Sequence, residues 1–330
     1  MPRPGSILYL TESDVQQTLT IAEAVDLAQK GIEADAAGQV AGDKFYMNVG
    51  EAGFIKPFSG YLLGEEMAFV KTFGFFPDNP TRFDCPTTSS MVLLFDAETG
   101  LPACLMEGGW LTALKTGAST AVTAACLALP DTTTATILGA GTLGRMHLRA
   151  LAQRFALQRA WLVDVLPDVA RTAAAELEAE LGFPVVPTSL DEREQAVRAS
   201  GIVITVTTGN QPLVEWAWLR PGAFVARLGS YQEVALEVIT RADKVIVDNW
   251  RYVRPRIPEL GMLAKEGRFG PEQVHAEWPD VVAGRRAGRE TRDEVIVYLA
   301  LGIWGEYAAI LPEMYRRARL LGLGQELART

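Results

Sequence analysis

The stretch Thr134-Ala-Thr-Ile-Leu-Gly-Ala-Gly-Thr-Leu-Gly144-Arg145 decides which fold this sequence predicts. A short apolar, β-branched run enters a loop with the glycine spacing G-x-G-x-x-G, and an apolar Ala/Leu-rich helix is expected to follow. In a dinucleotide-binding loop, Gly139 permits the tight turn and Gly141 lets the backbone approach a pyrophosphate, while Gly144 allows close packing of helix on strand. We therefore expect a bound dinucleotide; the alternative is a glycine turn in an unrelated α/β protein.

An acidic residue after the next strand favours NAD as the dinucleotide. The run Arg159-Ala-Trp-Leu-Val-Asp164 follows at the length of a βαβ unit and ends at the distance where an acid binds the ribose hydroxyls of NAD. An acid at this position repels the 2′-phosphate of NADP, and no Lys or Arg directly follows Asp164. Arg171 lies further on, in the next expected helix, and is the residue that could still admit NADP.

Two later strands are expected to end beside the same cofactor. In open parallel sheets, ligands bind at the carboxyl ends of the strands, where residues 207–208 and 229–230 are expected. The helix start at residues 142–143 offers backbone N–H groups to the phosphates. The expected cofactor-binding residues are therefore Gly139, Gly141, Thr142, Leu143, Gly144, Asp164, Thr207, Thr208, Gly229 and Ser230.

Composition excludes several classes of function. The chain has 330 residues, 48% of them hydrophobic and 22% charged, which is typical of a globular protein with room for two domains. A net charge of −9 without a basic patch argues against nucleic acid as a partner. With two histidines and no paired cysteines, we expect no metal site, and no apolar segment is long enough to span a membrane. Three cysteines without C-x-x-C spacing and a first segment without a signal-peptide core predict a cytoplasmic protein.

The order of the expected elements predicts an α/β fold with two domains. Residues 1–125 read as a mostly antiparallel sheet with a helix that begins at a Thr20/Glu23 capping box. Residues 126–300 alternate strands and helices, which predicts a doubly wound parallel Rossmann sheet. A helix pair from about residue 291, with Leu299 and Tyr307 on one face, is expected to bring residues 301–330 back to the first domain.

Several motifs together make the chain similar to the ornithine cyclodeaminase/mu-crystallin family. Beside the glycine loop, they are Val70-Lys71 with Asn79-Pro80, Leu94-Phe95-Asp96 with Thr99-Gly100, Leu111-Thr-Ala-Leu-Lys-Thr-Gly117-Ala118, Trp218-Leu-Arg-Pro-Gly222 and Gly288-Arg-Glu-Thr-Arg-Asp-Glu294. The resemblance implies a Rossmann domain and a substrate domain that dimerises through its sheet. It also implies chemistry at a nicotinamide on α-amino or α-imino acids.

Lys71 stands where this family has its active-site lysine, and other positions depart from the family's pattern. Lys115 replaces the family's Arg, Lys44 occupies another basic position, and Tyr231 falls where the cyclodeaminases have an Asp that grips the distal amine. A lysine lacks the planar fork with which an arginine holds a carboxylate bidentately.

Lysines dominate the segments expected to line the substrate cleft. An α-imino or α-amino acid presents a carboxylate, and we expect Lys44, Lys56, Lys71 and Lys115, with Tyr231, to bind substrate. Lys71 lies within an apolar stretch and is expected to orient the imine and assist proton transfer, with a pKa lowered by desolvation. For Lys56 the alternative is a solvated surface charge.

The function that follows is NAD(H)-dependent reduction of an α-imino acid, such as an imino dicarboxylate, to an L-amino acid, or the reverse dehydrogenation. One alternative is a cyclodeaminase that recycles NAD internally, against which Tyr231 counts because a buried ammonium needs a carboxylate. Another is a non-catalytic, mu-crystallin-like binding protein. The expected partners are a small-molecule substrate and a second copy of the chain.

Overall fold

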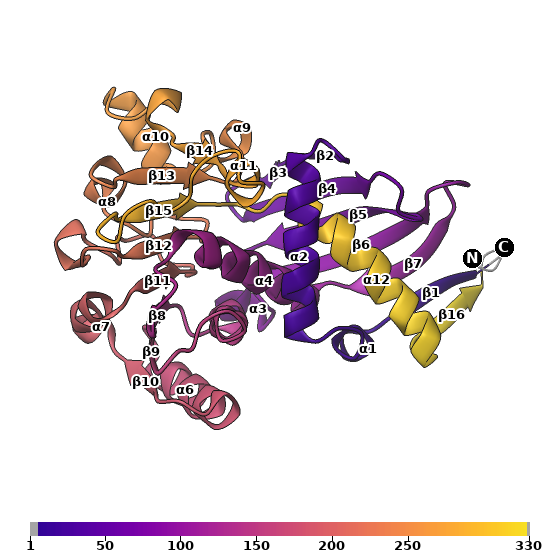
Figure 1. Cartoon of the computed structure of the whole chain (residues 1–330). Helices are drawn as coiled ribbons and strands as arrows, with labels where there is room; N and C mark the ends of the chain where they lie inside the picture. The colour runs from indigo at the N-terminus through magenta and orange to yellow at the C-terminus, as the bar shows by residue number, and fades with distance from the viewer. Residues whose placement is uncertain (1–5, 329–330) are drawn as a thin grey trace. The chain divides into compact units, whose positions relative to one another are not determined.

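A computed structural model describes residues 6–328 of the chain. The chain forms two compact units, one holding the chain up to Lys115 and from Trp304 on, the other holding Thr116–Ile303 (Figure 1). The first boundary lies earlier than the expected residue 125, and the second lies later than residue 300. No helix in the described part of the chain is long and apolar enough to cross a bilayer.

The first unit is built on one large sheet. Among the described residues, eight strands pair in the order β16-β1-β7-β6-β5-β4-β2, with β3 pairing to the other half of β4; only β1 and β7 run parallel. The elements of this unit are β1 (Ser6–Leu10), α1 (Glu12–Gln16), α2 (Ile21–Ala36), β2 (Val40–Lys44), β3 (Met47–Val49), β4 (Gly53–Leu62), β5 (Met67–Phe75), α3 (Asn79–Phe83), β6 (Thr88–Asp96), β7 (Pro102–Glu107), the start of α4 (Gly109–Leu127), α12 (Gly305–Leu321) and β16 (Gln325–Ala328).

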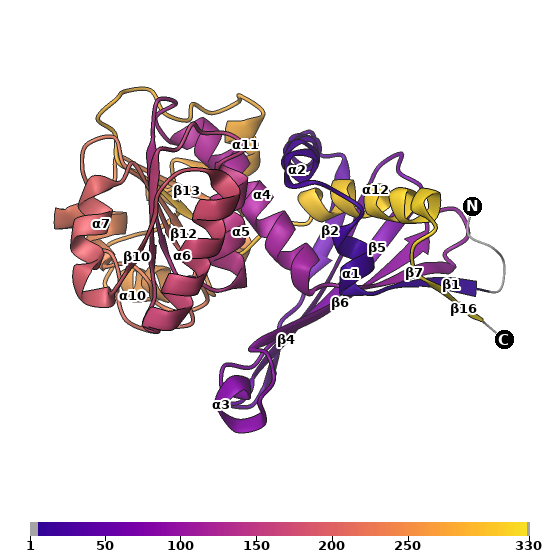
Figure 2. The same cartoon turned by 90° about the horizontal axis from the view of Figure 1, so that it is seen from below.

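Two helices cover one face of this sheet. Figure 2 shows α2 and α12 on the same side of the strands. The predicted capping box at the start of α2 is confirmed, because the Glu23 amide donates to the Thr20 hydroxyl and the Thr20 amide donates to the Glu23 carboxylate. The two helices meet at glycines, where a Cβ on Gly31 would lie 2.2 Å from the carbonyl oxygen of Gly305.

The second unit contains the predicted Rossmann sheet. Its strands are all parallel, in the order β10-β9-β8-β11-β12-β15-β13-β14. From β8, the strands β9 and β10 are added on one side of the sheet and β11 and β12 on the other, so the strand order reverses between β8 and β11. The elements are β8 (Thr134–Leu138), α5 (Thr142–Leu151), β9 (Arg159–Val163), α6 (Pro167–Leu181), β10 (Val185–Thr188), η1 (Leu190–Glu192), α7 (Arg193–Ala199), β11 (Ile202–Thr205), η2 (Trp216–Trp218), β12 (Phe224–Arg227), α8 (Leu236–Thr240), β13 (Lys244–Val247), α9 (Trp250–Val253), α10 (Pro258–Lys265), η3 (Pro271–Gln273), β14 (Ala276–Glu277), α11 (Trp278–Val282) and β15 (Ile296–Leu299).

The prediction of a helix pair from about residue 291 is wrong for its first half. Ile296–Leu299 is a fully buried strand, β15, inserted between β12 and β13. One helix, α12, follows and ends before strand β16, so the expected C-terminal helices are a helix and a strand within residues 6–328. A short apolar run has the same pattern in a buried strand as in a buried helix, so periodicity could not separate the two.

Replacing Gly31 with alanine should destabilise the first unit by about 1–3 kcal/mol, because the added methyl group meets backbone that cannot rotate away. The matched control is Gly261→Ala in α10, where no atom lies within 4 Å of the added Cβ and alanine should stabilise the helix by up to about 1 kcal/mol. Urea unfolding followed by circular dichroism measures both. Equal effects of the two substitutions would show that the α2–α12 contact is not tight.

Candidate active site

The glycine loop of the second unit has the shape of a phosphate cradle. Gly139 has φ +109°, and a Cβ there would lie 2.7 Å from the Val206 carbonyl oxygen. A Cβ on Gly144 would lie 1.8 Å from the carbonyl oxygen of Gly139, whereas Gly141 has open space at the same position. Gly141 caps α5 with no side-chain hydrogen bond, so the first N–H groups of the helix remain for an anion.

Asp164 holds this loop from the end of β9. One carboxylate oxygen accepts a hydrogen bond from the Ala140 amide at 2.9 Å, and the other accepts one from the Leu166 amide at 3.0 Å. Each oxygen retains a lone pair for a ribose hydroxyl. Arg171, the residue that could admit NADP, is exposed and forms an ion pair with Asp168.

Buried charges that the sequence analysis missed hold the ends of β11 and β12. The Glu233 carboxylate accepts hydrogen bonds from the Thr205 and Thr207 hydroxyls and from the Thr207 and Gly229 amides. Burial raises the pKa of Glu233, and the Arg227 charge and these hydrogen bonds oppose that rise. Arg227 is itself fully buried and pairs with Glu259 at 3.2 Å. Of the expected residues here, Thr207 and Gly229 belong to this network.

The first unit carries three of the predicted lysines, Lys44, Lys56 and Lys71, on one face of its sheet. Directly opposite residues on neighbouring strands point to the same face, and Phe58 on β4 lies opposite both Lys44 on β2 and Lys71 on β5. Lys44 and Lys71 are thus two strand spacings apart, roughly 10 Å. Lys56 lies two residues before Phe58 and shares the face.

Lys71 is buried among aromatic rings. Only 1% of its surface is exposed, and its ammonium lies 5.0 Å from the Phe73 ring centre, 5.4 Å from Phe58 and 5.4 Å from Tyr307. No acidic group within residues 6–328 forms an ion pair with it. Burial lowers the pKa of Lys71 well below the ordinary lysine value, and the nearby charges of Lys56 and Lys115 lower it further.

Lys115 differs from Lys71 because its charge is balanced inside the unit. Its ammonium lies 3.1 Å from a carboxylate oxygen of Glu306 at the start of α12, and both side chains are buried. The same ammonium lies 5.1 Å from the ring centre of Tyr307. Burial raises the pKa of the Tyr307 hydroxyl, which is hydrogen-bonded to Thr112 and stays protonated at neutral pH. Glu306 and Tyr307 are the site residues from α12 that no short motif indicated.

Lys56 lies on the edge of the same cluster and is half-buried. Its ammonium is 5.1 Å from the ring centre of Phe73, the ring that Lys71 also contacts, and 5.6 Å from that of Tyr46. Three of the four expected lysines thus lie around two aromatic rings, Phe73 and Tyr307. Tyr231 belongs to the second unit, where its carbonyl oxygen accepts a hydrogen bond from Arg227.

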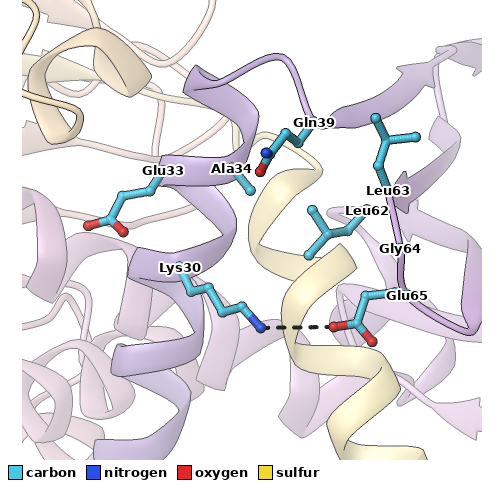
Figure 3. A pocket seen from close by; sticks show the side chains of 8 residues that line it. All are labelled: Lys30, Glu33, Ala34, Gln39, Leu62, Leu63, Gly64 and Glu65. Carbon is cyan, nitrogen blue, oxygen red and sulfur yellow. Dashed lines mark ion pairs between the residues drawn. The ribbon is translucent and has the colours of Figure 1, made fainter.

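Other sites in the described part of the chain offer less chemistry. The surface pocket between α2 and the β4–β5 turn holds none of the predicted residues and is crossed by a Lys30–Glu65 ion pair of 3.9 Å (Figure 3). No group of three or more potential metal ligands occurs within residues 6–328. His147 is fully buried in α5, where burial lowers its pKa to about 3, so it stays neutral.

Comparison with known proteins identifies the relatives of this chain. The model of the ornithine cyclodeaminase/mu-crystallin family matches residues 7–319. The chain belongs to this family. The family prediction is thereby confirmed, and the predicted Rossmann fold is confirmed by the sheet order and by the solved structures of other members.

Three family members indicate the chemistry of the relatives. The Δ1-pyrroline-2-carboxylate reductase of Thermococcus litoralis, solved with NADH and L-proline, is 28% identical with a TM-score of 0.93, over 97% of this chain and 100% of that one. An archaeal alanine dehydrogenase dimer with bound NAD is 25% identical with a TM-score of 0.89, over 98% and 99% of the two chains. The N-((2S)-2-amino-2-carboxyethyl)-L-glutamate dehydrogenase of Staphylococcus aureus is 29% identical over 78% of this chain and 76% of that protein.

For this family member, stability should rise with pH because of Lys71. The pKa of Lys71 is lower in the folded chain than in the unfolded one, so between the two values the unfolded chain binds more protons and unfolding becomes harder as pH rises. Lys71→Met should therefore be more stable than wild type at pH 6–7, with a difference that shrinks by at most about 1.4 kcal/mol per pH unit toward pH 10. Urea unfolding at a series of pH values measures this, with the exposed Lys265→Met as control for the loss of one charge. A pH-independent difference would contradict the lowered pKa.

The carboxylate of Asp164 should make this family member prefer NADH over NADPH by about tenfold or more, through repulsion of the 2′-phosphate. In Asp164→Asn the charge is gone, so most of the preference should disappear. The amide oxygen can still accept from the Ala140 amide, while the NH₂ group faces the Leu166 amide and loses that hydrogen bond. Fluorescence titration gives both dissociation constants. Tighter NADPH binding by the wild type would refute the prediction and make Arg171→Ala the next variant to measure.

Proposed function

We propose that this chain is an NAD(H)-dependent imino acid reductase, which converts an α-imino acid to an L-amino acid and runs the reverse dehydrogenation. The observation that carries the proposal is Lys71, a buried ammonium surrounded by aromatic rings and paired with no acid among residues 6–328. A charge buried in this way calls for an anionic ligand. The imino acid and amino acid chemistry named for the relatives supports a substrate carboxylate as that anion.

The residues of the second unit fit NAD. Gly139 and Gly144 have no room for a side chain, whereas Gly141 leaves open space beside the helix start, as close approach of a pyrophosphate requires. Asp164 would bind the hydroxyls of the adenosine ribose, and Thr207 and Gly229 would border the nicotinamide half of NAD. When bound, the reduced cofactor supplies the hydride.

Lys71 has two tasks in this proposal. Its ammonium binds the substrate and orients the C=N bond, and its lowered pKa makes it a stronger proton donor to the imine nitrogen. During reduction the C=N π bond breaks, the α-carbon gains a hydride, and the nitrogen gains or retains a proton to become the amine. Phe58, Phe73 and Tyr307 exclude water around the ammonium, which strengthens its attraction for the carboxylate.

Charge favours a substrate with a neutral or anionic side chain. Lys71 pairs with no acid among residues 6–328, and Lys56 adds a second positive charge beside the same ring, that of Phe73. A second carboxylate on the substrate would gain from Lys56, and a second amine would be repelled. We therefore propose an imino dicarboxylate as the preferred substrate, with small neutral imino acids as the alternative outcome.

The cyclodeaminase alternative gains no support from the loop after β12. The acidic residue in this loop, Glu233, is fully buried, and both of its carboxylate oxygens accept hydrogen bonds from the protein. Residues 229–233, around Tyr231, therefore offer no carboxylate that could bind the distal ammonium of ornithine.

A homodimer is the assembly we propose. The sheet face opposite α2 and α12 presents apolar side chains that are exposed or half-buried in the single chain: Tyr9, Tyr61, Val70, Met91, Leu93 and Leu105. A second copy covering this face would bury them, as the dimeric state of the archaeal alanine dehydrogenase supports. The cytoplasm is the location we propose, on the cysteine pattern of the sequence.

The experiment that tests the function follows NADH absorbance with a set of imines. The substrates are imines formed from oxaloacetate, pyruvate and a basic 2-oxo acid, together with the cyclic Δ1-pyrroline-2-carboxylate. Reduction of at least one is expected, with the oxaloacetate imine giving the highest kcat/KM. Lys71→Met should lose about 10²–10⁴-fold in kcat/KM while binding NADH normally. Lys56→Gln should lose activity mainly with the dicarboxylate.

Three outcomes would count against this reading. A preference for the basic substrate would refute the charge argument. An equal loss for all substrates in Lys56→Gln would remove Lys56 from side-chain recognition. Failure to reduce any imine, together with release of ammonia from ornithine, would instead support the cyclodeaminase.

A further inference from the structure

Glu233 is a fully buried carboxylate that joins two loops of the Rossmann unit. One oxygen accepts from the Thr207 amide at 2.6 Å and the Thr207 hydroxyl at 2.9 Å. The other accepts from the Gly229 amide at 2.7 Å and the Thr205 hydroxyl at 2.8 Å. Thr205 is the last residue of β11, Thr207 lies in the loop after it, and Gly229 follows β12. One side chain thus fixes the backbone at the carboxyl ends of two neighbouring strands.

The position of these strands indicates which half of a dinucleotide they would contact. β9 and β11 lie on opposite sides of β8, whose following loop carries the glycines. Asp164 follows β9 and marks that side as the adenosine side, because an acid there binds the adenosine ribose. When bound, the nicotinamide half would therefore lie toward the ends of β11 and β12, where Glu233 holds the loops.

We infer that Glu233 is a positioning residue for the nicotinamide half of the cofactor. It holds the Thr207 and Gly229 backbones in the conformation that binds NADH, without being in contact with the reacting atoms. This inference rests on the proposed function, since it takes NADH as the ligand of the second unit.

The two backbone N–H groups require a hydrogen-bond acceptor at each of the two Glu233 oxygens. Each oxygen of Glu233 faces one backbone N–H, which can only donate, and one hydroxyl. In Glu233→Gln, the amide NH₂ would replace one of the two oxygens. In either orientation it would oppose a backbone N–H, at Thr207 or at Gly229, and one loop would be released.

Arg227 and Glu259 hold the same loop from its backbone. The Arg227 guanidinium donates to the carbonyl oxygens of Gly229, at 2.6 Å, and of Tyr231. Glu259 accepts from the amides of Glu233 at 2.9 Å and Val234 at 3.3 Å. Arg227, Glu233 and Glu259 are all fully buried, and their hydrogen bonds together hold the loop after β12.

The test compares two ligands that share the adenosine half. ADP lacks the nicotinamide, so Glu233→Gln should raise the dissociation constant for NADH about tenfold or more and leave that for ADP within about twofold of wild type. Steady-state kinetics should show a higher KM for NADH with an unchanged KM for the imino substrate. Glu237→Gln, an exposed glutamate on α8, is the matched control and should bind both ligands as wild type does.

Thr205→Val provides a second, milder variant should Glu233→Gln fail to fold. It removes one hydroxyl donor to Glu233 from a buried strand position and keeps the side-chain shape. It should weaken NADH binding several-fold and spare ADP.

The inference is overturned if a folded Glu233→Gln binds NADH like wild type, or if it loses NADH and ADP equally. If that variant does not fold, the same two results in Thr205→Val overturn it. Failure of the wild type to bind NADH would instead overturn the proposed function itself.

Discussion

The costly burial of the Lys71 ammonium is the constraint around which the first unit is arranged. No carboxylate among residues 6–328 pairs with it, and the rings of Phe58, Phe73 and Tyr307 surround the ammonium. The neighbouring lysine, Lys115, has its own acid, Glu306, so the site keeps an excess of positive charge at Lys71. Burying this ammonium costs folding free energy, but it produces a preorganised positive site that an anion can bind.

The second unit uses carboxylates differently, to hold backbone in place. Asp164 binds the Ala140 amide in the glycine loop, and Glu233 binds the amides after β11 and β12. Loops at the carboxyl edge of a parallel sheet have no ladder partners of their own, so side chains must satisfy their N–H groups. The first unit thus contains a buried cation without an acidic partner among residues 6–328, and the second contains carboxylates that hold the loops at the carboxyl edge of its sheet.

The sequence predicted best where a function depends on neighbouring residues along the chain. The glycine spacing from Gly139 to Gly144 and the capping box at Thr20 are local patterns, and the structure contains the tight glycine loop and the cap that they predict. The strand β15 was missed because Ile296–Leu299 could have been helical on its pattern alone. Its place between β12 and β13 depends on strands far away in the sequence.

By itself the sequence determined the family, the Rossmann unit and the buried setting of Lys71, because motif spacing and apolar context are written in consecutive residues. Only the tertiary structure decided that Lys115 is balanced by Glu306, that Tyr307 covers Lys71, and that Glu233 joins two loops. These contacts link the C-terminal helix to the first sheet and one strand end to the next. The physical reason is that charge balance depends on distance in space, and residues far apart in the chain set that distance only after the strands and helices have packed.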